Sequence, residues 1–171
     1  YEEKVRHFVE SVLDDSEFRS DLEEFVAPLV EPGRVNSLAQ VLIKATAPGV
    51  PDFYQGTELW DLSLVDPDNR RPVDFGLRRR LLDEMKSLTP EGILSRMDEG
   101  LPKLWVIRQA LSLRNLLADV FDFGSYRPIY TKGERANHVV AFSRNDKVVT
   151  LVPRLLLSMD GDWKGTWVEL P

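Results

Sequence analysis

The sequence has 171 residues, of which 43% are hydrophobic, enough for a core of ordinary size. Its 28 Asp and Glu residues outnumber 22 Lys and Arg residues, and this net charge of −6 gives no general reason to expect a nucleic-acid partner. Cysteine is absent, which excludes disulfides and thiolate metal sites. The absence of cysteine fits a cytoplasmic location, which we expect. No apolar run reaches the roughly 18 residues that a membrane span requires, so no membrane partner is expected.

Three helices are predicted over the first 46 residues. Apolar side chains recur at helical spacing in residues 1–13, and the pattern repeats in residues 18–30. The polar residues 14–16 separate the two helices. Glu31-Pro32-Gly33 is expected to end the second helix, because proline lacks a backbone donor. A third helix is predicted over residues 34–46.

The central part of the chain predicts one strand and further helices. Val50–Tyr54 is short, apolar and aromatic, which is typical of a buried strand. A helix is predicted over Gly76–Leu88, with its leucines buried and its basic residues exposed. Thr89 and Pro90 mark the start of another helix, since proline is favoured at the first helical position. The widest apolar face belongs to a helix expected over Lys103–Phe121.

Beyond Gly124 the pattern becomes strand-like, with turn signals between the strands. The predicted strands are Tyr126–Tyr130, Val139–Ser143, Val148–Val152 and Thr166–Leu170. They indicate a small antiparallel sheet, so the fold class is α+β. A single buried strand between helices is one unit of a larger α/β structure, because it cannot satisfy its own backbone groups. The sequence begins within a helical pattern, and we therefore expect a fragment of a longer protein, which self-associates or rearranges at the unpaired strand.

Residues 47–75 contain four prolines and two glycines, so they cannot form one long helix. They also carry four aromatic residues, six acidic residues and the pair Arg70-Arg71. Long loops inside compact domains are uncommon unless they are functional or disordered, and this aromatic content argues against disorder. Polar groups beside aromatic rings suit a hydroxyl-rich ligand. The acids could also supply a catalytic pair, but spacing selects none, and capping turns or pairing with the arginines is the alternative.

Other catalytic and cofactor signatures are missing from the sequence. His7 and His138 are far apart, and neither has a partner at metal-ligand spacing. There is no glycine-rich phosphate loop and no local serine–histidine–aspartate signature. We therefore expect no metal and no cofactor.

The segment PGVPDFYQGTEL resembles the eighth-strand motif of the α-amylase superfamily, glycoside hydrolase family thirteen, which has the form G-x-P-x-x-Y-x-G-x-E. The matching positions are Gly49, Pro51, Tyr54, Gly56 and Glu58. The continuation into WDLSLVDPDNRRPVDF is similar to one branch of that family, the maltooligosyl trehalose synthases. The resemblance is dense over residues 33–75 and looser over the remainder.

This resemblance implies a (β/α)₈ barrel whose active site lies at the carboxyl ends of the strands. It implies an isomerisation in which the reducing-end α-1,4 bond of a maltooligosaccharide becomes an α,α-1,1 bond, a step of trehalose biosynthesis. The family's three catalytic carboxylates follow strands four, five and seven, and none of those motifs is present in this chain. No catalytic residue is therefore assigned, and the chain alone is expected to be inactive. Residues 1–88 would be the end of the barrel, residues 89–122 a helical connection and residues 123–171 a β-domain.

The resemblance also places the loop after the eighth strand along the wall of a maltooligosaccharide cleft. The predicted substrate-binding residues are Tyr54, Gln55, Glu58, Trp60, Asp68, Asn69, Arg70 and Arg71. For Glu58 and Arg71, an ion-pair role that fixes the loop is an equal alternative. For the whole chain, the alternative is a non-catalytic domain that binds glucan through Trp163 and Trp167 or has only a structural role.

Overall fold

The computed structural model describes residues 1–170. Its α-helices are α1 (Glu2–Asp14), α2 (Ser16–Thr46), α3 (Phe75–Glu84), α4 (Pro90–Leu94), α5 (Leu101–Leu116) and α6 (Ala118–Asp122). Its strands are β1 (Tyr126–Ile129), β2 (Thr131–Lys132), β3 (Val139–Arg144), β4 (Val148–Pro153) and β5 (Trp167–Val168). Helices precede the antiparallel strands along the chain, as the sequence predicts.

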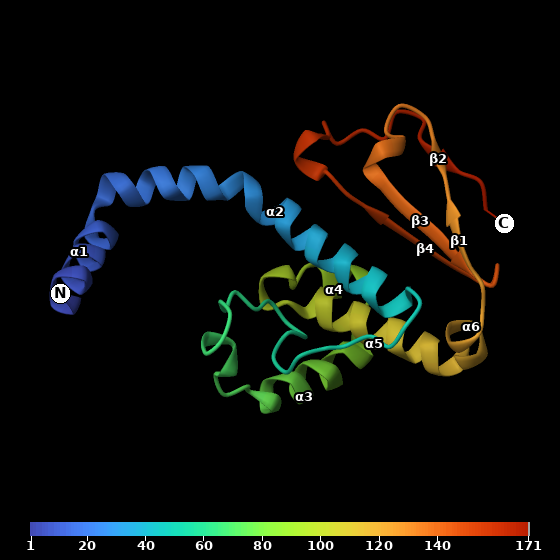
Figure 1. Ribbon diagram of the computed structural model, residues 1–171, viewed down its shortest axis with the longest axis horizontal. Helices are drawn as coiled ribbons and strands as arrows, with labels where there is room; N and C mark the ends of the chain where they lie inside the picture. The colour runs from blue at the N-terminus through green and yellow to red at the C-terminus, as the bar shows by residue number, and fades with distance from the viewer. Residues whose placement is uncertain (171) are drawn as a thin grey trace.

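Helix α1 and the first half of α2 project away from the rest of the molecule (Figure 1). The Asp15 carboxylate caps α2 by accepting from the backbone N–H groups of Glu17 and Phe18, at 2.9 and 3.0 Å. The break expected at residues 31–33 is wrong, because α2 continues through Pro28 and Pro32. Strong helical patterns flank both prolines, so the helix bends in its middle instead of ending (Figure 1).

The strand expected at Val50–Tyr54 is also wrong. These residues lie outside both sheets, and 94% of Val50 is exposed to solvent. A strand needs a neighbouring strand to accept and donate its backbone hydrogen bonds. No strand within residues 1–170 lies beside this segment, so it runs as an irregular connection.

The main hydrophobic cluster forms where α3, α4 and α5 meet. Its buried members are Leu59, Leu81, Met85, Ile93, Leu101 and Leu104. Leu59 belongs to the long connection between α2 and α3, so this cluster anchors the connection to the helices. The Thr89 hydroxyl caps α4 by accepting from the Gly92 N–H at 3.2 Å, which confirms the predicted helix start.

The expected helix over Lys103–Phe121 is divided. Leu117 leaves helical geometry, with φ −117° and ψ 44°, and separates α5 from α6. This change of direction lets Val120 and Phe121 pack with Val148 of the sheet in a second buried cluster.

The strands form two antiparallel sheets instead of one. The larger has the order β1-β3-β4, with Phe142 of β3 between Pro128 and Thr150. The smaller pairs β2 with β5. Strand β2 falls between two predicted strands, because a strand of two residues has no periodicity to detect.

Arg144 joins the larger sheet to the helices. It is 2% exposed, and its guanidinium donates to the carbonyls of Phe121 at 2.7 Å, and of Thr46 and Gly124 at 3.3 Å. Burial lowers the pKa of Arg144. The end of α2, the end of α6 and strand β3 therefore meet at one side chain.

Candidate functional site

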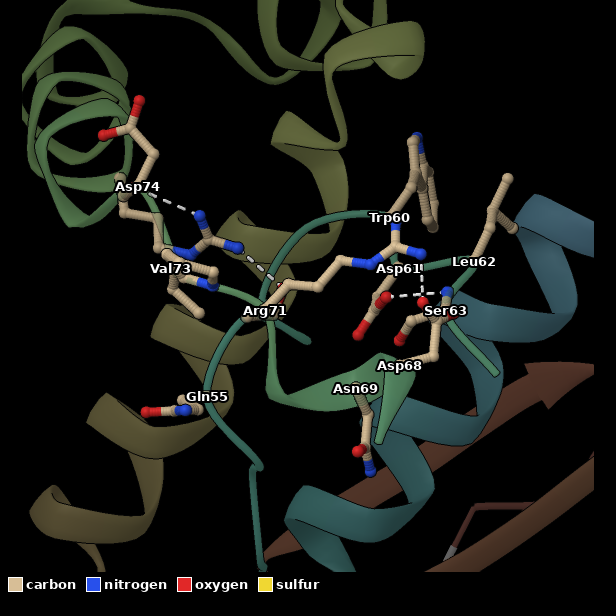
Figure 2. Close-up of a pocket in the computed structure, with 13 residues that line it drawn as sticks. Gln55, Trp60, Asp61, Leu62, Ser63, Asp68, Asn69, Arg71, Val73 and Asp74 are labelled. Atoms are coloured by element: carbon tan, nitrogen blue, oxygen red, sulfur yellow. Dashed lines mark hydrogen bonds and ion pairs between the residues drawn. The ribbon is translucent and has the colours of Figure 1, made fainter. Parts of the chain in front are cut away.

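A polar cavity of about 440 Å³ lies in the connection between α2 and α3 (Figure 2). Its polar lining consists of Gln55, Asp61, Ser63, Asp68, Asn69, Arg71, Asp74 and Arg78. Trp60 supplies the aromatic wall. Hydrogen-bond donors and acceptors beside one indole ring are suited to a ligand with several hydroxyl groups.

The structure brings together five of the eight residues predicted to bind substrate. These five are Gln55, Trp60, Asp68, Asn69 and Arg71. Tyr54, Glu58 and Arg70 do not line the cavity. Tyr54 and Arg70 are exposed beside it, and Arg70 pairs with Asp66. Their role in substrate binding remains a prediction.

We define the site loop as residues 56–74. Glu58 and Arg78 form an ion pair that holds the two ends of this loop together, and we call this pair the tether. The Glu58 carboxylate accepts from Arg78 Nε at 2.8 Å and from the Gly56 N–H at 3.1 Å. Arg78 also donates to the carbonyls of Gly56, at 2.7 Å, and Asp74, at 3.1 Å. One arginine therefore contacts both ends of the loop.

The sequence pattern does not identify Arg78, because the basic residues of this helix are expected to face solvent. A signal was available: Arg78 precedes the buried Leu81 by three positions, and such residues share a helix face. Arg79 and Arg80 are directed to solvent.

Arg71 and Asp68 form an ion pair within the loop. Figure 2 shows the Arg71 side chain extended along the cavity toward Asp68. The other Asp68 oxygen accepts from the Leu64 N–H at 2.7 Å. Glu58 and Arg71 thus both form ion pairs, as the alternative interpretation expected, but with different partners.

Trp60 is held in place from behind the cavity. Its indole N–H donates to the Met97 carbonyl at 2.6 Å. The buried Lys103 donates to the Leu59 carbonyl at 3.0 Å, and burial lowers the pKa of this lysine. Gly100 has φ +75°, and a Cβ there would lie 2.9 Å from the Trp60 backbone nitrogen, so only glycine fits.

Two polar residues of the lining, Asp61 and Asn69, differ in their hydrogen bonding. The Asp61 carboxylate accepts from the Ser63 N–H at 2.9 Å, and the hydrogen bonds from Ser63 lower the pKa of Asp61. Asp61 is therefore an ionised acceptor at neutral pH. Asn69 also lines the cavity, and its Oδ1 is buried without a hydrogen-bond partner among the described residues.

A second, mainly apolar cavity of about 610 Å³ adjoins the first. It lies between α2 and the site loop, and Trp60, Asp61 and Leu62 border both cavities. Val26, Leu29 and Val30 of α2 supply its apolar wall.

Trp163 and Trp167 lie apart from this site. They border a small cavity of about 180 Å³ at the smaller sheet, and the Lys132 ammonium lies 4.8 Å from the centre of the Trp167 ring. Within residues 1–170, no group of three or more His, Asp or Glu side chains is arranged to hold a metal ion. None of the helices in the same range has the length and apolar content of a membrane span.

Comparison with known proteins gives consistent results, although no family profile matches the chain. A protein of Mycobacterium tuberculosis assigned as a maltooligosyl trehalose synthase is 40% identical over 172 residues, which cover 100% of this chain and 20% of that protein. The solved maltooligosyltrehalose synthase of Arthrobacter ramosus matches with a TM-score of 0.86 and 38% identity, over 99% of this chain and 22% of that one. A structure from Sulfolobus tokodaii, described as a hypothetical maltooligosyl trehalose synthase, matches with a TM-score of 0.72 and 34% identity, over 90% of this chain and 20% of that one.

The chain therefore corresponds, along its whole length, to one segment of larger carbohydrate-active enzymes. Those enzymes are maltooligosyl trehalose synthases, and the matching segment is a C-terminal part of them. The resemblance found in the sequence is confirmed. The chain spans about one fifth of the length of the relatives that it matches.

Proposed function

We propose that this chain is the C-terminal part of a cytoplasmic intramolecular transglycosylase, which converts the reducing-end α-1,4 bond of a maltooligosaccharide into an α,α-1,1 bond. The observation that carries the proposal is the similarity of the whole chain to maltooligosyl trehalose synthases, at 40% identity. The hydroxyl-binding character of the loop cavity supports it. The product would be a maltooligosyl trehalose.

In this proposal the chain supplies binding and shielding, and the catalytic carboxylates lie elsewhere in the enzyme. Trp60 covers one face of a glucose ring, while Gln55, Asn69 and the Asp68–Arg71 pair contact its hydroxyls. A transglycosylase must keep water away from its glycosyl-enzyme intermediate, because attack by water gives hydrolysis. The tethered loop is suited to that role, since Arg78 and Glu58 hold both of its ends.

An assay with maltopentaose tests the proposal. The full-length protein that carries this segment should remove reducing ends while releasing little glucose, and the 171-residue chain alone should do neither. Turnover by the chain alone would contradict the proposal and direct attention to the acids between Asp52 and Asp74. A full-length protein that is inactive on every maltooligosaccharide would also contradict it.

The shielding role has its own test. Asn69→Ala in the full-length protein should raise the ratio of glucose to trehalose-type product, because it removes a polar group from the cavity wall. Asn115→Ala, an exposed position on α5, is the matched control and should leave the ratio unchanged. An unchanged ratio for Asn69→Ala would rule out this role for Asn69.

A further inference from the structure

Lys103 of α5 is a lysine in the interior of the helical part of the molecule. Only 8% of it is exposed, although lysine is almost never fully buried unless it is paired. Its ammonium donates to a backbone carbonyl, that of Leu59 at 3.0 Å, and to no carboxylate within residues 1–170. Burying a charge opposes folding, and an apolar side chain of similar volume would fill the same space without that cost. Packing alone therefore does not explain a lysine at this position.

The Lys103 ammonium acts on three consecutive residues of the site loop. Besides holding the Leu59 carbonyl, it lies 5.8 Å from the centre of the Trp60 ring, within the distance at which a cation attracts an aromatic face. Its charge adds to the hydrogen bonds from Ser63 that lower the pKa of Asp61. Trp60, Asp61 and Lys103 also border the same second cavity. One cation on α5 thus contacts or attracts each residue at the point where the loop leaves its buried anchor.

The turn before α5 holds the other side of Trp60. The Met97 carbonyl accepts from the Trp60 indole N–H at 2.6 Å and from the Gly100 N–H at 3.0 Å. The turn therefore fixes the edge of the indole, while Lys103 lies over its face. Two separate contacts define the orientation of the ring as well as its position.

Asp61 is placed to complement the Trp60 ring. It is the next residue in the chain, it is exposed, and it borders both the polar and the second cavity. An aromatic ring covers an apolar sugar face, whereas an ionised carboxylate accepts from the hydroxyls at the edge of the sugar. Hydrogen bonds to an ionised acceptor are roughly twice as strong as those between neutral groups. The sequence pattern does not distinguish Asp61 from the other acids of this loop.

We propose that Asp61 accepts hydrogen bonds from maltooligosaccharide hydroxyls beside Trp60, and that Lys103 is the positioning residue that holds this pair in place. The inference deepens the proposed function and rests on it. Lys103 acts through the loop and not on the sugar: it holds the Leu59 carbonyl, the Trp60 ring and the Asp61 charge. A lysine that only ties α5 to the loop would contribute to stability without acting through Asp61.

Steady-state kinetics with maltopentaose on the full-length protein test the inference. Lys103→Met should raise KM about 10-fold and leave kcat within about 2-fold, because it weakens substrate and transition-state binding alike. Asp61→Asn should raise KM by a similar factor, and its exposed position makes it compatible with folding. Lys86→Met, the same change at an exposed lysine, is the matched control and should leave KM unchanged. An unchanged KM in Lys103→Met or in Asp61→Asn would overturn the inference.

The double variant Lys103→Met/Asp61→Asn distinguishes a positioning residue from a structural one. Because Lys103 acts partly through Asp61, the KM of the double variant should lie well below the product of the two single effects, about 100-fold. Effects that multiply to that product would overturn the positioning role. If Lys103→Met does not fold, Lys103→Gln replaces it in this cycle, since glutamine removes the charge and keeps an N–H donor.

Failure of the proposed function gives a different result. A full-length protein that is inactive on maltopentaose refutes the function, and the Kd for maltopentaose then replaces KM in the same comparison. An active protein whose KM is unchanged in both single variants refutes this inference alone. A protein that neither converts nor binds maltopentaose refutes both.

Discussion

Arg78 holds the two ends of the site loop through one guanidinium, which is bonded to Glu58 and to the carbonyls of Gly56 and Asp74. Arg78→Met should leave the Glu58 carboxylate with the Gly56 N–H as its remaining donor, and should remove the arginine donors from these carbonyls. Because both charged side chains are mostly buried, we expect a loss of about 1.5–3 kcal/mol in the free energy of unfolding.

Urea unfolding of the chain measures this loss, and limited proteolysis should show faster cleavage in the site loop. Arg79→Met is the matched control, because Arg79 is exposed on the same helix. Equal unfolding midpoints for the two variants would show that the tether does not hold the loop.

Asp160 provides a test of surface electrostatics. Its hydrogen bond with Lys164, at 2.8 Å in the ion pair, and the charge of Arg135 lower the pKa of Asp160 to about 2. Since the pKa in the folded state lies below that in the unfolded state, its stabilising effect is present above about pH 4. That effect is lost as the pH falls from about 4 to about 2.

An NMR titration of the carboxyl carbon of Asp160 should have its midpoint near pH 2. Lys164→Gln should move the midpoint upward, toward the ordinary value of 3.8. A midpoint that Lys164→Gln leaves in place would contradict the assigned cause.

At the scale of elements, Arg144 of β3 connects this strand to α2 and α6 by donating to the carbonyls of Thr46, Phe121 and Gly124. Arg144→Met should cost about 1–3 kcal/mol, because it leaves buried acceptors without donors. Arg127→Met is the control: Arg127 pairs with Asp146 at 3.1 Å on the surface, and such pairs contribute about 0–1 kcal/mol. If thermal unfolding gave the same Tm for the two variants, the connecting role of Arg144 would be refuted.

The second prediction at the scale of elements concerns Pro32 in helix α2. Pro32 cannot donate to the carbonyl of Pro28, four residues before it. Pro32→Ala should restore that donor and slow amide exchange in the first half of α2, with a gain of up to about 3 kcal/mol in local helix stability. Pro48→Ala, outside the helix, should leave this exchange unchanged. Faster exchange in Pro32→Ala would mean that the bend itself is stabilising.

Elements whose signals are local could be predicted from the sequence. The Thr89 cap, the α5 periodicity and the alternation in β4 all depend on residues within one element. The strand expected at Val50–Tyr54 required a neighbour that the chain does not provide. The break expected at Pro32 ignored the helical patterns on both sides, which outweigh one missing hydrogen bond.

For the whole molecule, the position of the polar cavity could be predicted, but the contacts that form it could not. Turn residues, acids and aromatic rings concentrated in residues 47–75 indicated a binding loop, and the cavity formed there. The tether depends on Glu58 and Arg78, which are 20 positions apart. Contacts at that separation depend on how α3 packs on the core, and no local sequence pattern predicts that packing.

The attachment of the site loop has a consequence for how the cavity can diversify. Leu59 and Trp60 are anchored on one side and Asp74 on the other, while no residue in the stretch 61–72 is buried. Doubling the length of such a stretch costs only about 0.6 kcal/mol in closure entropy. Insertions and exchanges there can change which ligands fit the cavity without disturbing the helices beneath, so this stretch is the part of the site loop that tolerates variation best.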